Sequence, residues 1–436
     1  MKNSLLITLL GSLAFSSLAH GQIELKDVTQ DITFLASDDL KGRQTFTAGI
    51  DNAGQYIATS FKQAGLVPLS GLDSFHQSFS LYSIVPRSNN IILNGTKITS
   101  DNVMTISSFE SLKWNNTDGV NVRYIRAEDK FSKVMAQANS VNGDSLIIVA
   151  PIHQESFTRY KKHFDRGLNK LASNAGASAV VVLSDIEQLN QFDLSVTNDI
   201  KQQALANIVG VLPGSSKADE IILYSAHYDH LGQDSSLKGD TIYNGADDDA
   251  SGTSAIMALA KHFSQQGNNA RTLMFVAFTA EEIGGFGSQY FSNKLNPASI
   301  TAMINIEMIG KPSKFGAGTF WMTGFERSDL GAILNRNLAT ISQQVYPDPY
   351  PKQKLFYRSD NATLARLGVP AHSVSSTQLD QDKHYHNVSD DINSLDLVSM
   401  TKVINAIAVA SESLVNGKDA PSRLDASKVK KAGTIF

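Results

Sequence analysis

The hydrophobic pattern beyond residue 207 is that of buried strands alternating with helices. Continuous apolar runs at residues 221–226, 272–279 and 302–306 are separated by segments with helical spacing. The clearest such segment spans residues 251–266, where the apolar positions fall on one helix face: Ile256, Leu259, Ala260 and Phe263. Strands that are apolar throughout are typical of a mostly parallel sheet covered by helices on both faces. The pattern therefore predicts an α/β fold.

A different pattern occupies residues 87–206, where short strand-like runs alternate with Asn, Gly and Ser turns. We expect buried strands at residues 144–150 and 176–183 and a helix near residues 157–172. The block contains no cluster of His, Asp and Glu, so we interpret it as an inserted domain without chemistry of its own. The flanking segments 22–86 and 207–418 then form one discontinuous domain, and the basic tail at residues 419–436 is expected to be mobile.

The strands of this discontinuous domain end in residues that can bind metals or move protons. His227 and Asp229 end the first, Glu281 and Glu282 follow the second, and Glu307 follows the third. Three consecutive aspartates, at positions 247–249, precede the predicted helix. Ligands of open α/β sheets bind at the carboxyl ends of the strands. Carboxylates crowded there form either a metal site or a very costly arrangement of like charges.

The chain of 436 residues contains no Cys, so any metal must be held by His, Asp and Glu. These ligands suit Zn²⁺ in a catalytic site. Two metal ions need a bridging carboxylate and roughly two further ligands each. The inventory fits that requirement: His227, Asp248, Glu282, Glu307 and His386. Because Glu281 adjoins Glu282, one carboxylate can bind metal while the other acts as general base on the bound water.

Charge and the N-terminus restrict the partners and the location. The formal net charge is -4, which gives no electrostatic case for nucleic-acid binding. Residues 1–21 have the pattern of a signal peptide: Lys2, an apolar run over residues 5–15, then small residues. The run is too short for a membrane span. We expect an exported protein, periplasmic or secreted, and the sequence does not indicate its oligomeric state.

Five motifs, in order, resemble those of the co-catalytic dizinc aminopeptidases, a family that also contains glutamate carboxypeptidase and the glutaminyl cyclases. The motifs are Ser225-Ala226-His227-Tyr228-Asp229-His230, residues 244–252, Ala280-Glu281-Glu282, Asn305-Ile306-Glu307-Met308, and Tyr385-His386 followed by Asp390-Asp391. Leu40-Lys41-Gly42-Arg43 and Gly176-Ala177 extend the resemblance over almost the whole chain after the signal. The resemblance implies the zinc exopeptidase fold, a three-layer sandwich around a mixed, mostly parallel sheet. It also implies that residues 87–206 form a β-rich protease-associated (PA) domain.

The resemblance further implies roles for individual residues. His227, Asp248 and Glu307 would bind one zinc ion, while Asp248, Glu282 and His386 would bind a second. Glu281 would be the general base, Asp229 would orient the imidazole of His227, and Tyr385 would stabilise the oxyanion. The Asp248-Asp249 peptide is often cis in this family. Asp247 and Asp249 are expected to shape the loop. For His230 and His384, roles beside a metal ligand, contacts with substrate and plain surface positions stay open.

Two positions depart from the family pattern. Glu307 stands where many members have Asp, and Asn361 stands where a Ser-Asp-His motif is common. The longer side chain of Glu307 still supplies oxygen ligands but can displace one metal ion slightly. Any role that the histidine of the common motif carries is missing at Asn361.

The function expected from these residues is an exported zinc-dependent aminopeptidase that removes N-terminal residues from peptide substrates. Metal-bound hydroxide would attack the carbonyl, with Glu281 handling the proton. A carboxypeptidase would need cationic residues for a C-terminal carboxylate, and Arg358 is the one candidate, although an ordinary salt bridge is favoured there. A glutaminyl cyclase uses one zinc ion, so the presence of both His227 and Glu307 argues against it. A non-enzymatic peptide-binding protein would have no need of Glu281. The PA-like insertion is expected to border or cover the cleft.

Overall fold

The central sheet is mixed, with a parallel centre. The computed structural model describes residues 22–140 and 143–431, so the predicted signal peptide at residues 1–21 lies outside the described residues. Strand β11 (Lys217–His227) pairs in parallel with β14 (Arg271–Phe278) and β15 (Ile300–Ile306), and β15 with β18 (Ala371–Ser375). On either side of this parallel centre the next pairing is antiparallel: β16 (Phe320–Met322) joins β18, and β10 (Phe192–Leu212) joins β14. Strands β17 (Val345–Pro347) and β1 (Val67–Pro68) complete this part.

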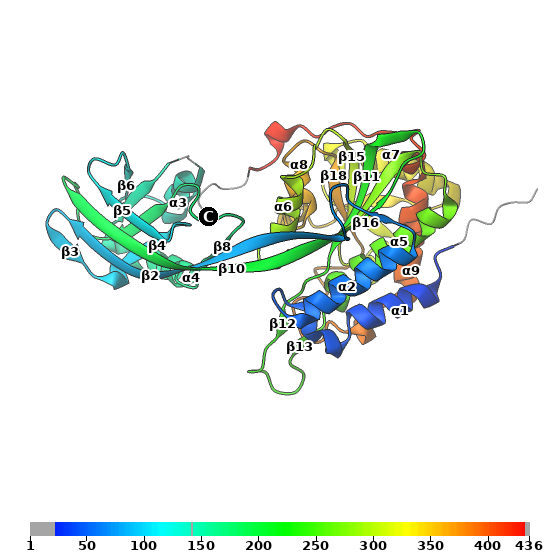
Figure 1. Cartoon of the computed structure of the whole chain (residues 1–436), viewed down its shortest axis with the longest axis horizontal. Helices are drawn as coiled ribbons and strands as arrows, with labels where there is room; N and C mark the ends of the chain where they lie inside the picture. Colours follow the sequence, from blue (N-terminus) through cyan, green and yellow to red (C-terminus); the bar gives the residue numbers. More distant parts are fainter. Residues whose placement is uncertain (1–21, 141–142, 432–436) are drawn as a thin grey trace, which may run out of the picture.

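Helices cover both faces of this sheet because successive strand residues point to opposite sides. On β11, Ile222, Tyr224 and Ala226 pack in a core that also holds the first helical layer. That layer comprises α1 (Leu25–Leu35), α2 (Ala48–Gln63), α5 (Gly252–Gln266), α7 (Leu330–Leu338), α9 (Leu397–Ala410) and α10 (Glu412–Val415). Leu223 points the other way, toward α6 (Phe286–Ser292) and α8 (Asn361–Ala365). The predicted three-layer α/β arrangement is therefore confirmed (Figure 1).

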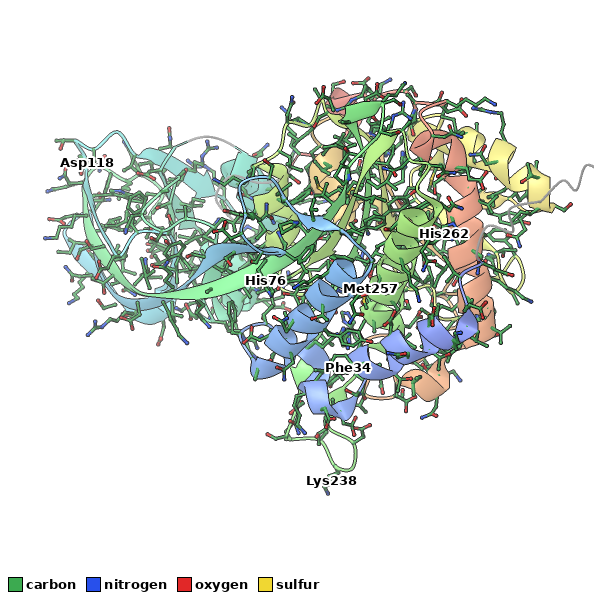
Figure 2. The ribbon with its side chains drawn as sticks, turned by 45° about the vertical axis from the view of Figure 1, so that its right-hand side comes forward. Phe34, His76, Asp118, Lys238, Met257 and His262 are labelled. Atoms are coloured by element: carbon green, nitrogen blue, oxygen red, sulfur yellow. The ribbon has the colours of Figure 1, made fainter. Side chains whose placement is uncertain are left out.

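Two long strands extend from the sheet and carry a second body. β2 (His76–Leu93) and β10 pair from His76↔Ile208 to Leu93↔Phe192, and we call this ribbon the arm. The second body contains a four-stranded sheet of β4 (Val103–Ile106), β9 (Ala179–Leu183), β7 (Ser145–Val149) and β6 (Asn121–Ile125). Helices α3 (Phe131–Ser140) and α4 (Gln154–Phe164) pack with it, and β3 (Thr96–Ile98), β5 (Ser111–Asn115) and β8 (Leu168–Lys170) pair with the arm. Figure 2 places Asp118 at its far end.

The structure differs from the sequence-based expectations within this body. The helix predicted near residues 157–172 ends at Phe164, and residues 168–170 form β8, which pairs with β2. Gly167 separates the two elements with φ +103, a conformation that a side chain would strain. The expected boundaries at Arg87 and Ala206 fall inside β2 and β10, so the strands of the arm are continuous through both.

The C-terminal segment is packed, which contradicts the expected mobility for residues 419–431. Leu424 and Val429 are buried in the core beneath α6 and α8. The guanidinium of Arg423 donates to the carbonyl of Ile300 at 2.7 Å. The remaining residues, 432–436, lie outside the described part of the chain. Among the residues that the structure describes, no helix is long and apolar enough to cross a membrane.

Candidate metal centre

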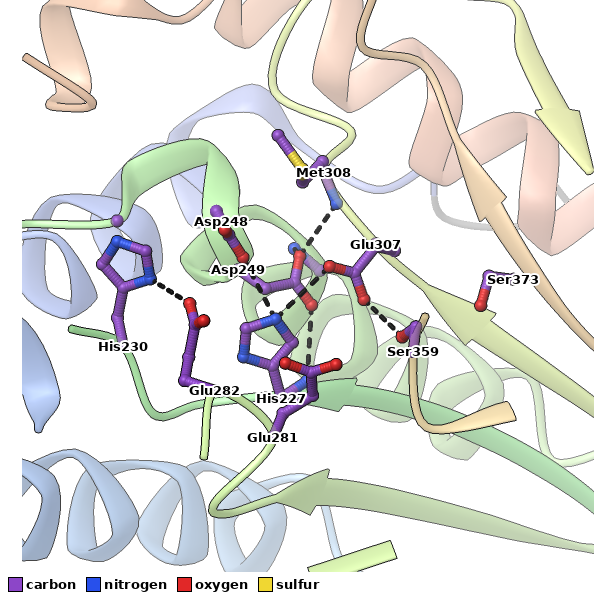
Figure 3. Close-up of polar contacts among 12 residues, drawn as sticks. His227, His230, Asp248, Asp249, Glu281, Glu282, Glu307, Met308, Ser359 and Ser373 are labelled. Carbon is purple, nitrogen blue, oxygen red and sulfur yellow. Dashed lines mark hydrogen bonds and ion pairs between the residues drawn. The ribbon is translucent and has the colours of Figure 1, made fainter. Parts of the chain in front are cut away.

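The predicted ligands meet at the carboxyl ends of the parallel strands (Figure 3). His227 ends β11, the loop of residues 246–251 leads into α5, and Glu281 and Glu282 lie in the turn between β14 and α6. Glu307 follows β15, and His386 comes from the long loop after β18. Parallel strands end at the same edge of a sheet, and this is why residues up to 159 positions apart can form one site.

The two carboxylate oxygens of Asp248 face different histidines. Its Oδ1 lies 3.1 Å from Nε2 of His227, which is also 3.3 Å from Oε1 of Glu307. Its Oδ2 lies 3.3 Å from Nε2 of His386, which is also 3.3 Å from Oε2 of Glu282. The structure thus brings all five predicted ligands together as two sets that share Asp248.

The spacing within each set fits zinc. Tetrahedral zinc with bonds of about 2.0–2.1 Å separates its ligand atoms by about 3.3 Å. The four contacts of 3.1–3.3 Å match that separation. Buried carboxylates at this density are also expensive without a compensating cation. The donors are imidazoles and carboxylates alone, which Zn²⁺ and similar ions accept.

The carboxylates of each ligand set raise the proton affinity of its histidine. Hydrogen bonds to Asp248 and Glu282 raise the pKa of His386 to about 10. Burial alone would lower the pKa of His227, but Glu307 and Asp248 outweigh it and hold that pKa well above the ordinary value. A metal ion must displace these protons, so its affinity should rise with pH.

His230 lies beside the second set but at a different distance. Its Nδ1 is 2.7 Å from Oε1 of Glu282, and His230, Asp248 and Glu282 offer potential ligand atoms within 4.8 Å of one another. The 2.7 Å contact is a hydrogen-bond length, too short for two ligands of one tetrahedral zinc ion. Figure 3 shows His230 and Glu282 facing each other. His230 therefore fixes the carboxylate of Glu282, while His386 completes the set.

The neighbours of Asp248 hold the loop in place. The carboxylate of Asp390 accepts the backbone N–H of Asp247 and of Asp248 at 3.1 Å. Asp247 accepts the N–H of Gly310 at 2.8 Å, and Asp249 accepts the N–H of Met308 at 3.0 Å. The Asp248-Asp249 peptide is cis. Asp247 and Asp249 thus bond to backbone donors, as expected for residues that shape the loop.

Asp229 acts on the glutamate turn more directly than on His227. Its carboxylate accepts the N–H of Glu281 at 3.0 Å and that of Glu282 at 3.3 Å. Its Oδ1 is 3.9 Å from Nδ1 of His227, whereas its own backbone carbonyl is 3.1 Å from that nitrogen. The backbone carbonyl of Asp229 therefore orients the imidazole of His227. The carboxylate of Asp229 positions Glu281 and Glu282.

Glu281 has the environment of a strong base. Burial raises its pKa well above the ordinary value, and the nearby carboxylates of Glu307 and Asp360 raise it further, while His227 opposes them. A raised proton affinity next to a metal ligand suits a group that takes and returns a proton.

Tyr385 and Arg358 lie at the mouth of the site. The ring of Tyr385 stacks on His386 with centroids 3.9 Å apart, and 38% of the residue is exposed. Arg358 donates to the Tyr385 hydroxyl at 3.4 Å. Within the described residues no carboxylate lies in salt-bridge range of Arg358, so the salt bridge favoured from the sequence is absent.

Two cavities flank the ligands. One, of about 320 Å³, is lined by Glu307, Met308, Trp321, Leu355 and Tyr385, among others. The other, of about 630 Å³, lies beside Glu281 and is lined largely by residues of α6, α8 and the segment between Tyr357 and Asp360. Glu281 lines the larger of the two cavities and Glu307 the smaller, while Arg358 and Ser359 line both.

Several residues at the site were not assigned from the sequence. Ser359 donates to Oε2 of Glu307 at 2.6 Å. The side-chain amide of Asn361 donates to the backbone carbonyls of Phe356 and Ala371 and not to a predicted ligand. Lys311 lies 3.4 Å from Asp247 and 3.6 Å from Asp390. Arg43 is buried, and burial lowers its pKa to about 10 against the opposing pull of Asp248 and other carboxylates. Except for Asn361, whose partners lie 5 and 10 residues away, these contacts join distant segments, so local spacing carried no signal for them.

A family model, that of peptidase family M28, matches residues 207–411. A probable leucine aminopeptidase of Arthroderma otae is 30% identical over 204 residues, which are 45% of this chain and 52% of that protein. A probable zinc metalloprotease of Pyrenophora teres f. teres is 33% identical over 144 residues, 32% of this chain and 30% of that protein. The chain spans about half the length of the leucine aminopeptidases that it matches.

Solved structures agree on the fold. A zinc aminopeptidase from Bacillus subtilis has a TM-score of 0.54 at 14% identity, covering 95% of this chain and 99% of that one. An aminopeptidase from Aneurinibacillus sp. strain AM-1 has a TM-score of 0.53 at 15% identity, covering 94% of this chain and 97% of that one. All five predicted ligands lie within residues 207–411, the part of the chain that matches the model of peptidase family M28.

Proposed function

We propose that the protein is a zinc-dependent aminopeptidase with two zinc ions, held by His227, Asp248 and Glu307 and by Asp248, Glu282 and His386. The observation that carries the proposal is the pair of ligand sets that share Asp248, with Glu281 next to a ligand of the second set. The names of the leucine aminopeptidases and zinc metalloproteases that it resembles support the same activity and metal.

The residues around the centre support a hydrolytic mechanism. When bound, the two ions would activate a water molecule and polarise the carbonyl of the scissile peptide bond. Glu281 would accept the proton of the water and deliver it to the leaving amine, a role that its raised pKa suits. Tyr385 would donate to the developing oxyanion from beside His386. Asp229 and His230 keep the two glutamates in position.

The two cavities suggest how a peptide lies in the site. The side chain of the N-terminal residue would occupy the space lined by Met308, Trp321 and Leu355, because Glu307 of the first ligand set borders it. The rest of the peptide would leave along the space beside Glu281. Arg358 borders both spaces, so a carboxypeptidase remains an outcome that the experiment must distinguish.

The inserted body would limit access to the site. Leu171, which follows β8, packs against a cluster of Phe79, Leu81, Leu205 and Ala280, and Ala280 directly precedes the two glutamates. We propose a PA-like domain that borders the cleft, and export directed by the signal-like residues 1–21. Export would be tested by sequencing the N-terminus of the protein recovered from the periplasm and the medium of the producing cells.

The test of the activity is mass spectrometry of a pool of short peptides incubated with the zinc-loaded protein. We expect stepwise loss of N-terminal residues, absent after chelation. Glu281→Gln keeps the size of the side chain but removes the base, and should lower kcat by about 100-fold to 10,000-fold. Glu412→Gln, at an exposed glutamate, is the matched control and should leave kcat unchanged.

Other products would overturn the proposed substrate class. Loss of residues from the C-terminus would indicate a carboxypeptidase, and loss of ammonia from N-terminal Gln would indicate a cyclase. An unchanged pool with zinc bound would favour a peptide-binding protein.

A further inference from the structure

Arg43 is one of two fully buried arginines among the described residues, and its guanidinium has no carboxylate partner. It instead donates to backbone carbonyls of the loops that carry the metal ligands. Nε donates to Tyr228 at 2.9 Å, Nη1 to Asn244 at 2.6 Å and Nη2 to Gly245 at 3.0 Å. Tyr228 follows His227 directly, and Gly245 lies three residues before Asp248, so one side chain bonds both loops.

The segment that carries Arg43 also packs closely against the chain between His227 and Asp248. A Cβ on Gly42 would collide with the carbonyl oxygens of Gly232 and Tyr243. These two residues lie on the short strands β12 (Gly232–Gln233) and β13 (Ile242–Tyr243), between His227 and Asp248 in the chain. Lys41, Gly42 and Arg43 all have positive φ. Asp38, in the same segment, accepts the side-chain amide of Asn244 at 2.9 Å. The N-terminal segment therefore meets the ligand loops at close range through both backbone and side chains.

We propose that Arg43 is a positioning residue for the metal centre, which sets the separation of His227 and Asp248 by binding the backbone of both loops. The inference rests on the proposed metal site but not on the peptidase reaction. Its charge also offsets part of the negative charge of the surrounding aspartates. Lysine at this position would keep the positive charge, but its ammonium group cannot replace the planar guanidinium, whose three nitrogens donate to three different carbonyls.

Arg271 provides a matched comparison. It is equally buried, and it also donates to backbone carbonyls, those of Leu414 at 2.7 Å and Asp419 at 2.6 Å. Unlike Arg43, it has a carboxylate partner, Glu220, at 2.6 Å. It lies at the opposite end of β14 from the glutamate turn and contacts none of the ligand loops. Substitution of Arg271 therefore reports the cost of disturbing a buried arginine without disturbing the metal centre.

The experiment compares Arg43→Lys with Arg271→Lys in the full-length protein stripped of metal. Zinc affinity is measured by competition with a chromophoric chelator, and ligand geometry by the absorption spectrum of bound Co²⁺. We expect Arg43→Lys to weaken zinc binding about 10-fold to 100-fold and to shift the Co²⁺ spectrum. Arg271→Lys should lower the thermal midpoint while leaving affinity and spectrum unchanged.

Wild-type affinity and spectrum in folded Arg43→Lys would overturn the inference, as would equal losses in both variants. If Arg43→Lys does not fold, Asp38→Ala decides, because it removes only the contact with Asn244. A weaker zinc affinity in that variant supports the inference, and an unchanged affinity overturns it. A wild-type protein that binds no zinc would instead refute the proposed metal site.

Discussion

At the scale of single residues, a partly buried carboxylate with a raised pKa occurs away from the metal centre as well. Asp31, on α1, lies between α1 and α2, where its Oδ1 accepts the hydroxyl of Tyr56 at 2.8 Å. Burial raises the pKa of Asp31 to about 6, from an ordinary value of 3.8. The unfolded chain thus releases this proton at lower pH than the folded chain. The free energy of unfolding therefore falls as pH rises from about 3.8 to about 6. Above pH 6 the ionised Asp31 lowers it by about 3 kcal/mol.

Asp31→Asn should remove that cost because the amide cannot ionise and still offers an oxygen to Tyr56. We expect a higher thermal midpoint than wild type at pH 8, by the equivalent of about 2–3 kcal/mol, and little difference near pH 4. Thermal unfolding at both pH values measures this. Asp73→Asn, at an exposed aspartate away from this contact, is the control and should bring no gain. A gain of equal size at both pH values would contradict the titration argument.

At the scale of elements, the strands of the central sheet could be predicted and the arm could not. The runs at residues 221–226, 272–279 and 302–306 are apolar because helices cover both of their faces, and that signal is local. The partners of β2 in β10 lie more than 100 residues away along most of the ribbon, and no local pattern encodes such a pairing. The same reasoning explains the site: strand ends revealed His227, Glu282 and Glu307, but not Ser359 or Lys311.

The arm meets α6 and the start of the turn that carries Glu281 and Glu282 through a small apolar cluster. Phe79 of β2 stacks on Tyr290 of α6 with centroids 4.7 Å apart, and Leu81, Leu205 and Ala280 surround them. Phe79→Ala should lower the free energy of unfolding by about 3 kcal/mol, since it leaves a cavity where a ring was buried. Denaturant unfolding measures the loss. Tyr290→Phe keeps the stacked rings and should stay near wild type; a similar loss there would mean that stacking is not what holds the arm.

At the scale of the whole molecule, contacts between distant segments decide what the sequence leaves hidden. The tail looked mobile because it is basic and rich in small residues, yet Leu424 and Val429 complete the core beneath α6 and α8. Arg43 looked like part of a motif without a role, yet it joins loops about 200 residues further along. In both cases the energetic reason is burial against a surface that only the folded chain creates.

The division into a catalytic part and an inserted body predicts that the two can be separated. Val85 pairs with Asp199 across the arm, so replacing residues 86–198 with an Asn-Gly turn would close the ribbon as a hairpin in its existing register. The cluster around Phe79 keeps its strand residues, and all five metal ligands lie outside the deletion.

We expect the shortened protein to fold, to bind zinc with wild-type affinity and to cleave short peptides at a similar rate. It should also lose the discrimination between short and long substrates that we propose for the inserted body. Zinc titration and cleavage of peptides of graded length test both parts. Unchanged size preference would leave the inserted body with no role in access, and loss of zinc binding would show that the body is needed to form the metal centre.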